Sequence, residues 1–369
     1  MDQEIEQLGQ ESCPGFRVSA PGRVCLFGEH SDYLGLDVIA AAIDLTIEIM
    51  AKPRDDRLIV IDYSDLKQKD EFTLGDFVEY RTKRDYVRGA FNVMARRGVI
   101  PKHGWDLQVI GTIPMAAGLS SSSALTVGCI KAITSMAGSD LSPYEIALRA
   151  YDAEVAEFHE SGGTMDHYAS SIGGIIHVDT RENKVSKLPA ELDIFVIGDS
   201  GEKKVDTVGD LRYIRSTVER EYKEISRNLK SFDRRKTALV EVQKLRQGIP
   251  TKERRMAEAT LRNRDLTNRA LKLLNKPSRG GTELGRMLKE HHEILRDDLE
   301  RSTTKIERMI TAAYDAGALG CKINGSGGGG SMMAYTVRDE QEVASSIERA
   351  GGTAYIVRVG KGVTITMRD

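Results

Sequence analysis

The first half of the chain mixes strand-like and helix-like hydrophobic patterns. Apolar side chains dominate residues 57–62 and partly alternate with polar ones in residues 105–110, so both segments are predicted strands. Residues 85–97 place their apolar side chains roughly on one side of a helix, and residues 121–136 form a second apolar stripe at helical spacing. The pattern predicts a domain in which strands and helices are interspersed.

A third helix begins with strong capping signals. Pro143 suits the first helical position after a capping Ser142, and Glu145 lies where it closes a capping box. The helix is expected to continue to about residue 158, before Gly162 and Gly163 end it.

The second half changes character near residue 190, which divides the chain into expected domains of residues 1–190 and 191–369. Residues 211–270 carry 17 Lys and Arg against 8 Asp and Glu, with little strand signal. Such an excess could form a nucleic-acid surface. Aromatic residues are not interleaved, however, so we favour the solvent-facing sides of several helices. Strands are expected again at 332–337 and 354–357.

Composition narrows the class of protein. The 369 residues are comfortable for two domains that share a cleft, and a net charge of −2 argues against a generally basic nucleic-acid binder. The longest apolar run, residues 38–43, is far shorter than the roughly 20 residues of a membrane span. The acidic N-terminus does not resemble a signal peptide, and four scattered cysteines disfavour a disulfide framework or a zinc site. We therefore expect a cytoplasmic protein.

The most informative stretch is a serine-rich segment between a predicted strand and the helix at 121–136. A helix N-terminus carries free N–H donors and a positive partial charge, so it suits an anion. A linker that merely caps the helix is the alternative, but a linker would not usually separate a strand from an amphipathic helix. Phosphate binding is favoured, outside the Walker A type because no Gly-Lys-Ser/Thr follows. The expected phosphate-binding residues are Gly118, Leu119, Ser120, Ser121, Ser122 and Ser123.

Glu154 is the second candidate. On the helix from Pro143 it shares a face with Ala147, Ala150 and Phe158, where an unpaired charge would be costly. A buried Arg or Lys partner explains this position as well as a Mg²⁺ shared with a nucleotide, since Mg²⁺ takes one or two protein oxygens together with phosphates and water. On this evidence the two interpretations are equally favoured.

Three further motifs are weak in isolation. An apolar strand that starts at Pro21 ends in Glu29, His30 and Asp32, which is either a polar turn or a set of acceptors for the hydroxyls of a polyol. Residues 161–166 form a flexible loop that presents Asp166. Residues 325–330 contain five glycines, which suit either a close ligand or a mobile turn.

Together, the order and spacing of these motifs resemble the GHMP kinase superfamily, and within it the galactokinases. Residues 21–33 are similar to the galactokinase signature, 118–124 to the family's phosphate loop, 163–168 to the loop with the catalytic Asp, and 322–331 to the Gly-rich third motif. The resemblance runs from about residue 17 to the C-terminus. It implies a two-domain α+β GHMP kinase fold with the active site in the interdomain cleft.

The resemblance also implies roles for individual residues. ATP phosphates would lie along residues 118–123, Mg²⁺ would be held by Ser122 and Glu154, and Asp166 would accept the proton of the attacking hydroxyl or orient it. Arg23 would keep Asp166 ionised and stabilise charge on the transferring phosphoryl group. The implied substrate contacts are Glu29, His30, Asp32, Gly163 and, with poorer spacing, Tyr213.

The implied activity is ATP-dependent phosphorylation of a monosaccharide, at the anomeric hydroxyl as in galactokinases. Cys25 and Leu34 stand where the signature usually has Asn, and His167 replaces a Gln. These departures lie beside the residues expected to read the sugar, so arabinose, a uronic acid and an N-acetylated hexosamine are alternatives to galactose. A non-catalytic sugar and ATP sensor is the rival of another class, although sensing alone would not need Asp166 beside Arg23. Neither a nucleic-acid nor a membrane partner is expected.

Overall fold

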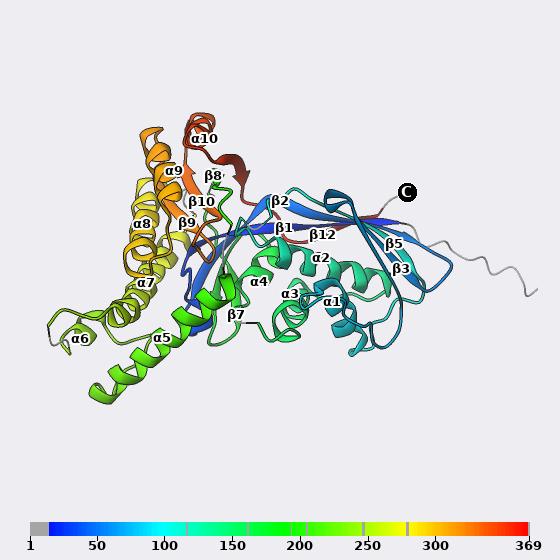
Figure 1. The fold of residues 1–369 in the computed structure, drawn as a ribbon, viewed down its shortest axis with the longest axis horizontal. Helices are drawn as coiled ribbons and strands as arrows, with labels where there is room; N and C mark the ends of the chain where they lie inside the picture. Colours follow the sequence, from blue (N-terminus) through cyan, green and yellow to red (C-terminus); the bar gives the residue numbers. More distant parts are fainter. Residues whose placement is uncertain are drawn as a thin grey trace, which may run out of the picture.

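The computed structural model describes residues 15–115, 117–160, 162–192, 194–203, 206–245, 248–277 and 280–367. Two sheets divide this part of the chain, each with helices packed on it (Figure 1). No helix among the described residues is both long and apolar enough to cross a membrane.

The first sheet is built mainly by the N-terminal half. A central path of six strands runs in the order β12 (Thr364–Met367), β1 (Phe16–Phe27), β2 (Val38–Pro53), β5 (Trp105–Gly111), β3 (Leu58–Tyr63) and β4 (Gln68–Thr73). Strand β6 (Ile175–Asp179) pairs with β2 and with β7 (Lys184–Lys187). The pairs are antiparallel except that of β3 with β5. The helices on this sheet are α1 (Tyr86–Ala95), α2 (Ser121–Met136), α3 (Pro143–Tyr151) and α4 (Met165–Ile172).

The second sheet starts at residue 194 and is antiparallel. Its order is β11 (Thr353–Arg358), β8 (Ile194–Asp199), β10 (Ser331–Thr336) and β9 (Gly320–Asn324). It is packed by α8 (Gly281–Glu293), α9 (Thr304–Asp315) and α10 (Glu340–Arg349). Farther along this side lie α5 (Thr207–Asn228), α6 (Leu239–Gln243) and α7 (Lys252–Leu274). The chain finally returns to the first sheet through β12.

Most of the elements expected from the hydrophobic pattern are confirmed within a few residues. The segments at 57–62, 85–97, 105–110, 121–136, 332–337 and 354–357 correspond to β3, α1, β5, α2, β10 and β11. The capping box between Ser142 and Glu145 is present. The helix expected to reach about residue 158 is α-helical to Tyr151 and continues as a π-helix, Asp152–Ala156, with Glu157 as its cap. It therefore ends close to the expected residue, but the type of its last turns was not foreseen.

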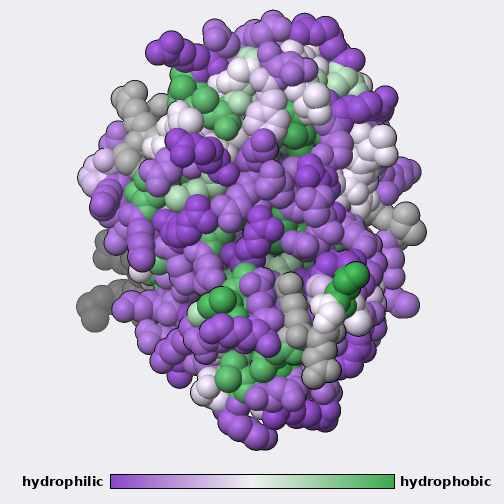
Figure 2. All heavy atoms as spheres, turned by 90° about the vertical axis from the view of Figure 1, so that its left-hand side faces the viewer, coloured by the Kyte–Doolittle hydropathy of each residue, from purple (hydrophilic) through white to green (hydrophobic). Residues whose placement is uncertain are grey.

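The basic stretch at 211–270 forms the helices α5, α6 and α7. Figure 2 shows the side of the molecule on which the second-half helices lie, and its surface is predominantly hydrophilic with small, scattered apolar areas. Most of the charged side chains of α5, α6 and α7 are at least partly exposed to solvent, as the favoured interpretation of this stretch expected, whereas Glu258 and Arg264 are buried.

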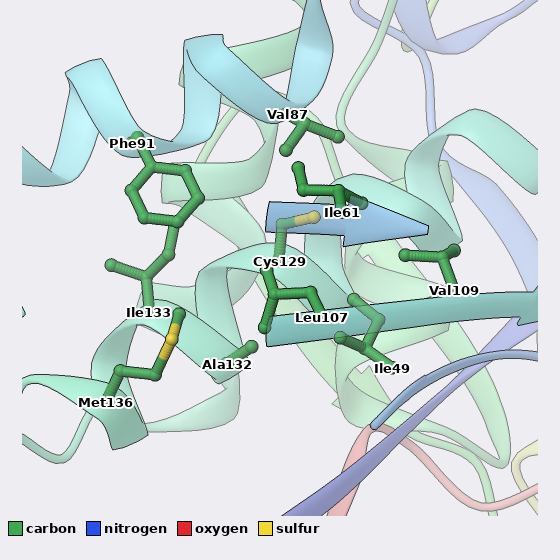
Figure 3. Close-up of a pocket in the computed structure, with 10 residues that line it drawn as sticks. All are labelled: Ile49, Ile61, Val87, Phe91, Leu107, Val109, Cys129, Ala132, Ile133 and Met136. Carbon is green, nitrogen blue, oxygen red and sulfur yellow. The ribbon is translucent and has the colours of Figure 1, made fainter. Parts of the chain in front are cut away.

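The core of the first domain lies between its sheet and the helices α1 and α2. Figure 3 shows apolar side chains from both layers around a void, among them Ile61, Phe91, Leu107 and Ile133. The void measures about 10 Å³, which is no more than a single water requires. It is a gap in the packing and is too small for a substrate.

Candidate active site

The central contact of the site joins β1 to the start of α4. Arg23 Nε and Nη2 each donate to one oxygen of Asp166, both at 2.7 Å. This bidentate pair is largely buried, since the side chain of Arg23 is 7% exposed and that of Asp166 is 26% exposed. Burial alone would raise the pKa of Asp166, but the charge and hydrogen bonds of Arg23 lower it below its ordinary value. Asp166 is therefore held ionised.

The phosphate loop packs directly against the same strand. The backbone N–H of Arg23 donates to Leu119 O at 3.1 Å. A Cβ at Gly22 would lie 2.7 Å from Leu119 O, so only glycine allows this approach. Ser120 adopts a left-handed backbone conformation with φ of 61°, and its hydroxyl donates to Asp166 at 2.6 Å. The loop and the carboxylate are thus positioned together.

At the N-terminus of α2, the helix that follows the loop, the positive partial charge of the helix dipole is not balanced by an acidic side chain. The first turn of α2 holds no acidic residue, and no side chain caps it. Ser121, Ser122 and Ser123 line the same cleft as Arg23. Free N–H groups, hydroxyls and the helix dipole together favour a phosphate at this place.

Glu154 reaches the cleft from the π-helix. Single π-turns inside α-helices occur frequently at functional sites. The residue is buried, and its Oε2 lies 2.7 Å from Nε2 of His167, the residue after Asp166. The ion pair with a buried Arg or Lys, which was the alternative for Glu154, is not found among the described residues. The carboxylate of Glu154 and the hydroxyl of Ser122 line the same cleft as the phosphate loop, and both are hard oxygen donors that suit Mg²⁺.

Several acidic and polar side chains from the segment after β1 line the cleft together with Arg23. Glu29 forms a buried ion pair with Lys322 of β9, at 2.8 Å between Oε2 and Nζ. Nδ1 of His30 lies 2.8 Å from the Tyr33 hydroxyl. Burial, with the nearby charge of Asp166, raises the pKa of Asp32 to about 6. Such groups are hydrogen-bond partners for hydroxyls.

Gly163 packs directly on the side chain of Asp32. A Cβ at this position would lie 1.8 Å from Asp32 Oδ2. Any side chain at residue 163 would therefore displace the carboxylate, which explains the glycine in physical terms.

The Gly-rich third motif ties the two halves of the chain together. Asn324 Oδ1 accepts from the backbone N–H of Cys25 at 3.1 Å, and its Nδ2 donates to Gly118 O at 2.8 Å. The same carbonyl accepts from Arg23 Nη1 at 2.6 Å. The hydroxyl of Ser331 donates to Ala117 O at 2.6 Å. The turn of the phosphate loop is thus fixed from the second domain.

Arg23, Asp166, Glu154 and the phosphate loop line one cleft of about 930 Å³, which has two chemically different regions. The polar region contains Arg23, Glu29, His30, Asp32 and Asp166. The other region is largely apolar and is formed by neighbouring strands and the start of α2; its lining includes Ile47, Tyr63, Leu66, Val109, Ile113 and Leu125. The phosphate loop lines the cleft as well.

The structure brings nearly all sequence-predicted site residues to this cleft. Its lining includes Arg23, Glu29, His30, Asp32, Gly118, Leu119, Ser120, Ser121, Ser122, Ser123, Glu154, Gly163 and Asp166. Tyr213 is not in the lining: it lies on α5 and is 48% exposed.

The three departures lie at different depths beside the site. Cys25 is fully buried with its thiol near the carbonyl oxygens of Phe27 and Ile39, and Leu34 is buried in the hydrophobic core. Neither lines the cleft, whereas His167 does. Two of the three departures therefore lie behind the cleft wall, and only His167 can contact a bound substrate directly.

Sequence reasoning missed the roles of Lys322 and Asn324. Both lie within the third motif, which was noted for its glycines. A Lys and an Asn directly before a Gly-rich loop were the available signal, but their partners are about 200 to 300 residues away in the chain.

Comparisons with known proteins agree with this geometry. Residues 85–174 match the GHMP kinases N terminal domain, residues 270–356 match the GHMP kinases C terminal family, and residues 5–53 match the galactokinase galactose-binding signature. The mevalonate kinase of Thermococcus onnurineus is 31% identical over 351 residues, which cover 92% of this chain and 95% of the relative. The galactokinase of Haemophilus influenzae strain Rd is 27% identical, with 98% of each chain covered.

Solved structures confirm the expected two-domain α+β fold. A structure of Lactococcus lactis galactokinase complexed with galactose matches with a TM-score of 0.83 at 23% identity, covering 95% of each chain. The mevalonate kinase of Methanococcus jannaschii matches with a TM-score of 0.72 at 21% identity, covering 96% of this chain and all of the other.

Proposed function

This chain belongs to the GHMP kinase family, and we propose that it is an ATP-dependent kinase that phosphorylates a monosaccharide at the anomeric hydroxyl. The observation that carries the proposal is the acidic, acceptor-rich region around Asp166. Asp32 and Glu29 lie there beside the Arg23–Asp166 pair. Several acceptors within one small region suit a molecule with many hydroxyl donors.

The cleft divides between the two substrates. The apolar region, with Tyr63, Leu66 and Val109, would take the nucleobase, because an aromatic heterocycle is stabilised by apolar walls. The phosphates would lie along the loop and the N-terminus of α2. The sugar would then meet Asp32 and His30, with the reacting hydroxyl directed to Asp166.

Asp166 would act mainly by orientation. Its carboxylate accepts a hydrogen bond from the sugar hydroxyl, whose oxygen attacks the γ-phosphorus while the bond to the ADP oxygen breaks. A carboxylate with a lowered pKa is a weak base, so the proton is transferred late, as a loose phosphoryl-transfer transition state permits. Arg23 stabilises charge on the phosphoryl oxygens from the same position.

Glu154 and Ser122 are the residues that would hold Mg²⁺. When bound, the ion would neutralise charge on the β- and γ-phosphate oxygens. Glu154 is a carboxylate at the phosphate-binding part of the cleft and has one hydrogen-bond partner, His167, among the described residues.

A coupled ADP-release assay tests the proposal. The panel contains galactose, arabinose, a uronic acid, an N-acetylated hexosamine and mevalonate, each with and without Mg²⁺. We expect at least one sugar to stimulate ADP release. The amount of reducing sugar should fall by the amount of ADP released, because a phosphate on the anomeric oxygen blocks ring opening. ADP release with retention of the reducing end would place the phosphate on another hydroxyl.

Mevalonate is the second candidate acceptor. Lys203 lines the cleft and could pair with a carboxylate, and several curated relatives near 30% identity are named mevalonate kinases. If mevalonate alone stimulates ADP release, the sugar assignment is wrong. If sugar and ATP bind but no acceptor in the panel reacts, the protein is a sensor.

A further inference from the structure

Two buried side chains from separate elements meet beside the phosphate loop. Glu154 lies on the π-helix and His167 in the first turn of α4, and both line the cleft. The side chain of His167 is 2% exposed and that of Glu154 is 10% exposed. Their contact of 2.7 Å is as short as a charge-assisted hydrogen bond.

The direction of this hydrogen bond follows from the chemistry of the two groups. A carboxylate oxygen only accepts, so the proton lies on Nε2 of His167, which donates to Oε2. Nδ1 of the same ring is buried and has no hydrogen-bond partner within the part of the chain that the structure describes. The ring also packs edge-on against Tyr151, with 5.6 Å between the ring centres. The ring is therefore held by packing and makes one hydrogen bond, to Glu154.

The position of His167 in the chain gives this contact a functional setting. The preceding residue, Asp166, is fixed by two hydrogen bonds from Arg23. Two consecutive residues of α4 are therefore linked to the proposed reaction. Asp166 is proposed to orient the sugar hydroxyl, and His167 contacts Glu154, which is proposed to hold the metal. A shift of this turn would move both groups together.

We propose that His167 is a positioning residue that occupies one oxygen of Glu154 and leaves the other to face Mg²⁺. Carboxylates that bind metals are commonly oriented by such hydrogen bonds, and losing the partner typically weakens metal binding by about 10- to 100-fold. A single available oxygen suits the octahedral shell of Mg²⁺, whereas Ca²⁺ readily takes both oxygens of a carboxylate. The inference rests on the proposed function only in taking Glu154 as the metal ligand.

The test measures binding of ADP by calorimetry with Mg²⁺, with Ca²⁺ and with EDTA, and needs no acceptor sugar. His167→Leu removes the donor and keeps an apolar side chain of moderate size. It should lower the Mg²⁺-dependent part of the ADP affinity about tenfold, and leave affinity in EDTA unchanged. The preference for Mg²⁺ over Ca²⁺ should fall as well. His167→Gln retains an N–H donor and should stay within about threefold of the wild type.

Three further variants make the result decisive. Glu154→Gln defines the full loss of the metal-dependent part. His167→Asn, whose amide is too short to reach Glu154, should behave as His167→Leu does and replaces it if the leucine variant does not fold. His177→Leu removes another His–carboxylate contact, that with Asp37, and should leave the metal-dependent ADP affinity unchanged.

Equal Mg²⁺-dependent affinities in the Leu, Asn and Gln variants and the wild type would overturn the proposal. A loss of affinity in EDTA as large as that with Mg²⁺ would also overturn it, since that pattern marks a purely structural role. If no sugar supports ADP release while the metal-dependent differences appear, the proposed function fails and the role of His167 stands.

Discussion

At the scale of single residues, Asp166 gives the first prediction. Asp166→Asn keeps the size of the side chain and an oxygen that accepts from Arg23, but it removes the negative charge that orients the hydroxyl. We expect kcat/KM to fall roughly 10²- to 10⁴-fold, the range for one proton-transfer group, with little change in ADP affinity. Asp140→Asn is the control, because the side chain of Asp140 is 91% exposed. A tenfold loss or less would show that Asp166 is not central to the reaction.

Asp32 gives a prediction about stability and pH. Its folded-state pKa of about 6 lies above the ordinary value of 3.8, so the folded chain retains a proton that the unfolded chain releases. The associated stabilisation is complete below pH 3.8 and is lost as the pH rises through 6. Asp32→Asn avoids this loss and should raise the free energy of unfolding at pH 8 by about 3 kcal/mol, and by roughly half as much at pH 5.

Urea unfolding of both proteins at the two pH values measures this difference. The same variant should bind its sugar more weakly, since an amide both donates and accepts where the carboxylate only accepts. A gain in stability that does not depend on pH would mean that the Asp32 carboxyl group has an ordinary pKa.

Residue contacts also mark the limit of sequence reasoning. Glu154 was predicted from its position on an apolar helical face, and the roles of Arg23 and Asp166 followed from the family resemblance. The partners of Glu29 and Glu154 were not predicted, because Lys322 and His167 reach them only after the chain has folded. Burial of Leu34 was likewise not evident, since its neighbours in the sequence are polar residues and a glycine.

At the scale of elements, local signals were the ones that predicted structure. The capping box at Ser142 and the serine-rich start of α2 determine helix beginnings within a few residues. The π-turn after Tyr151 has no such signal, because it changes the backbone pairing without interrupting the helical hydrophobic pattern. Strand β2 was missed for a related reason: its first residues form one apolar run without alternation, and its pairing with β5 and β6 joins distant segments.

The link between β9 and the phosphate loop gives the third prediction. Asn324→Ala leaves the buried N–H of Cys25 unpaired and removes one of two donors to Gly118 O. A buried group without a partner costs about 1–3 kcal/mol, so the free energy of unfolding should fall by that amount. Because the phosphate loop is loosened, KM for ATP should rise more than KM for the sugar.

Denaturant unfolding and steady-state kinetics check this prediction. Asn228→Ala is the matched control, since Asn228 is exposed at the end of α5. If KM for the sugar rises and KM for ATP does not, Asn324 acts through β1, which it contacts at Cys25, and not through the phosphate loop.

At the scale of the whole molecule, the site depends on contacts between the two halves of the chain. The second sheet begins with β8 at Ile194, yet β12 returns to pair with β1. Glu29 is paired with Lys322 from β9, and the phosphate loop is fixed by Asn324. The chain length and the order of the motifs predicted a cleft shared by two domains. The individual contacts across it could not be predicted, because they join segments that are distant in the sequence.

One such cross-link supports the loop that carries the proposed sugar contacts. Arg235, between α5 and α6, donates to Gly35 O at 2.7 Å and forms ion pairs with Asp37 and Asp179. Arg235→Ala should lower the free energy of unfolding by about 2 kcal/mol, because hydrogen bonds to charged groups are lost. Since Asp32 lies in the supported loop, KM for the sugar should rise several-fold while KM for ATP stays nearly constant. Arg227→Ala, at a side chain that is 71% exposed, should change neither quantity. An unchanged KM for the sugar in a destabilised Arg235→Ala protein would show that the loop holds its position without the second domain.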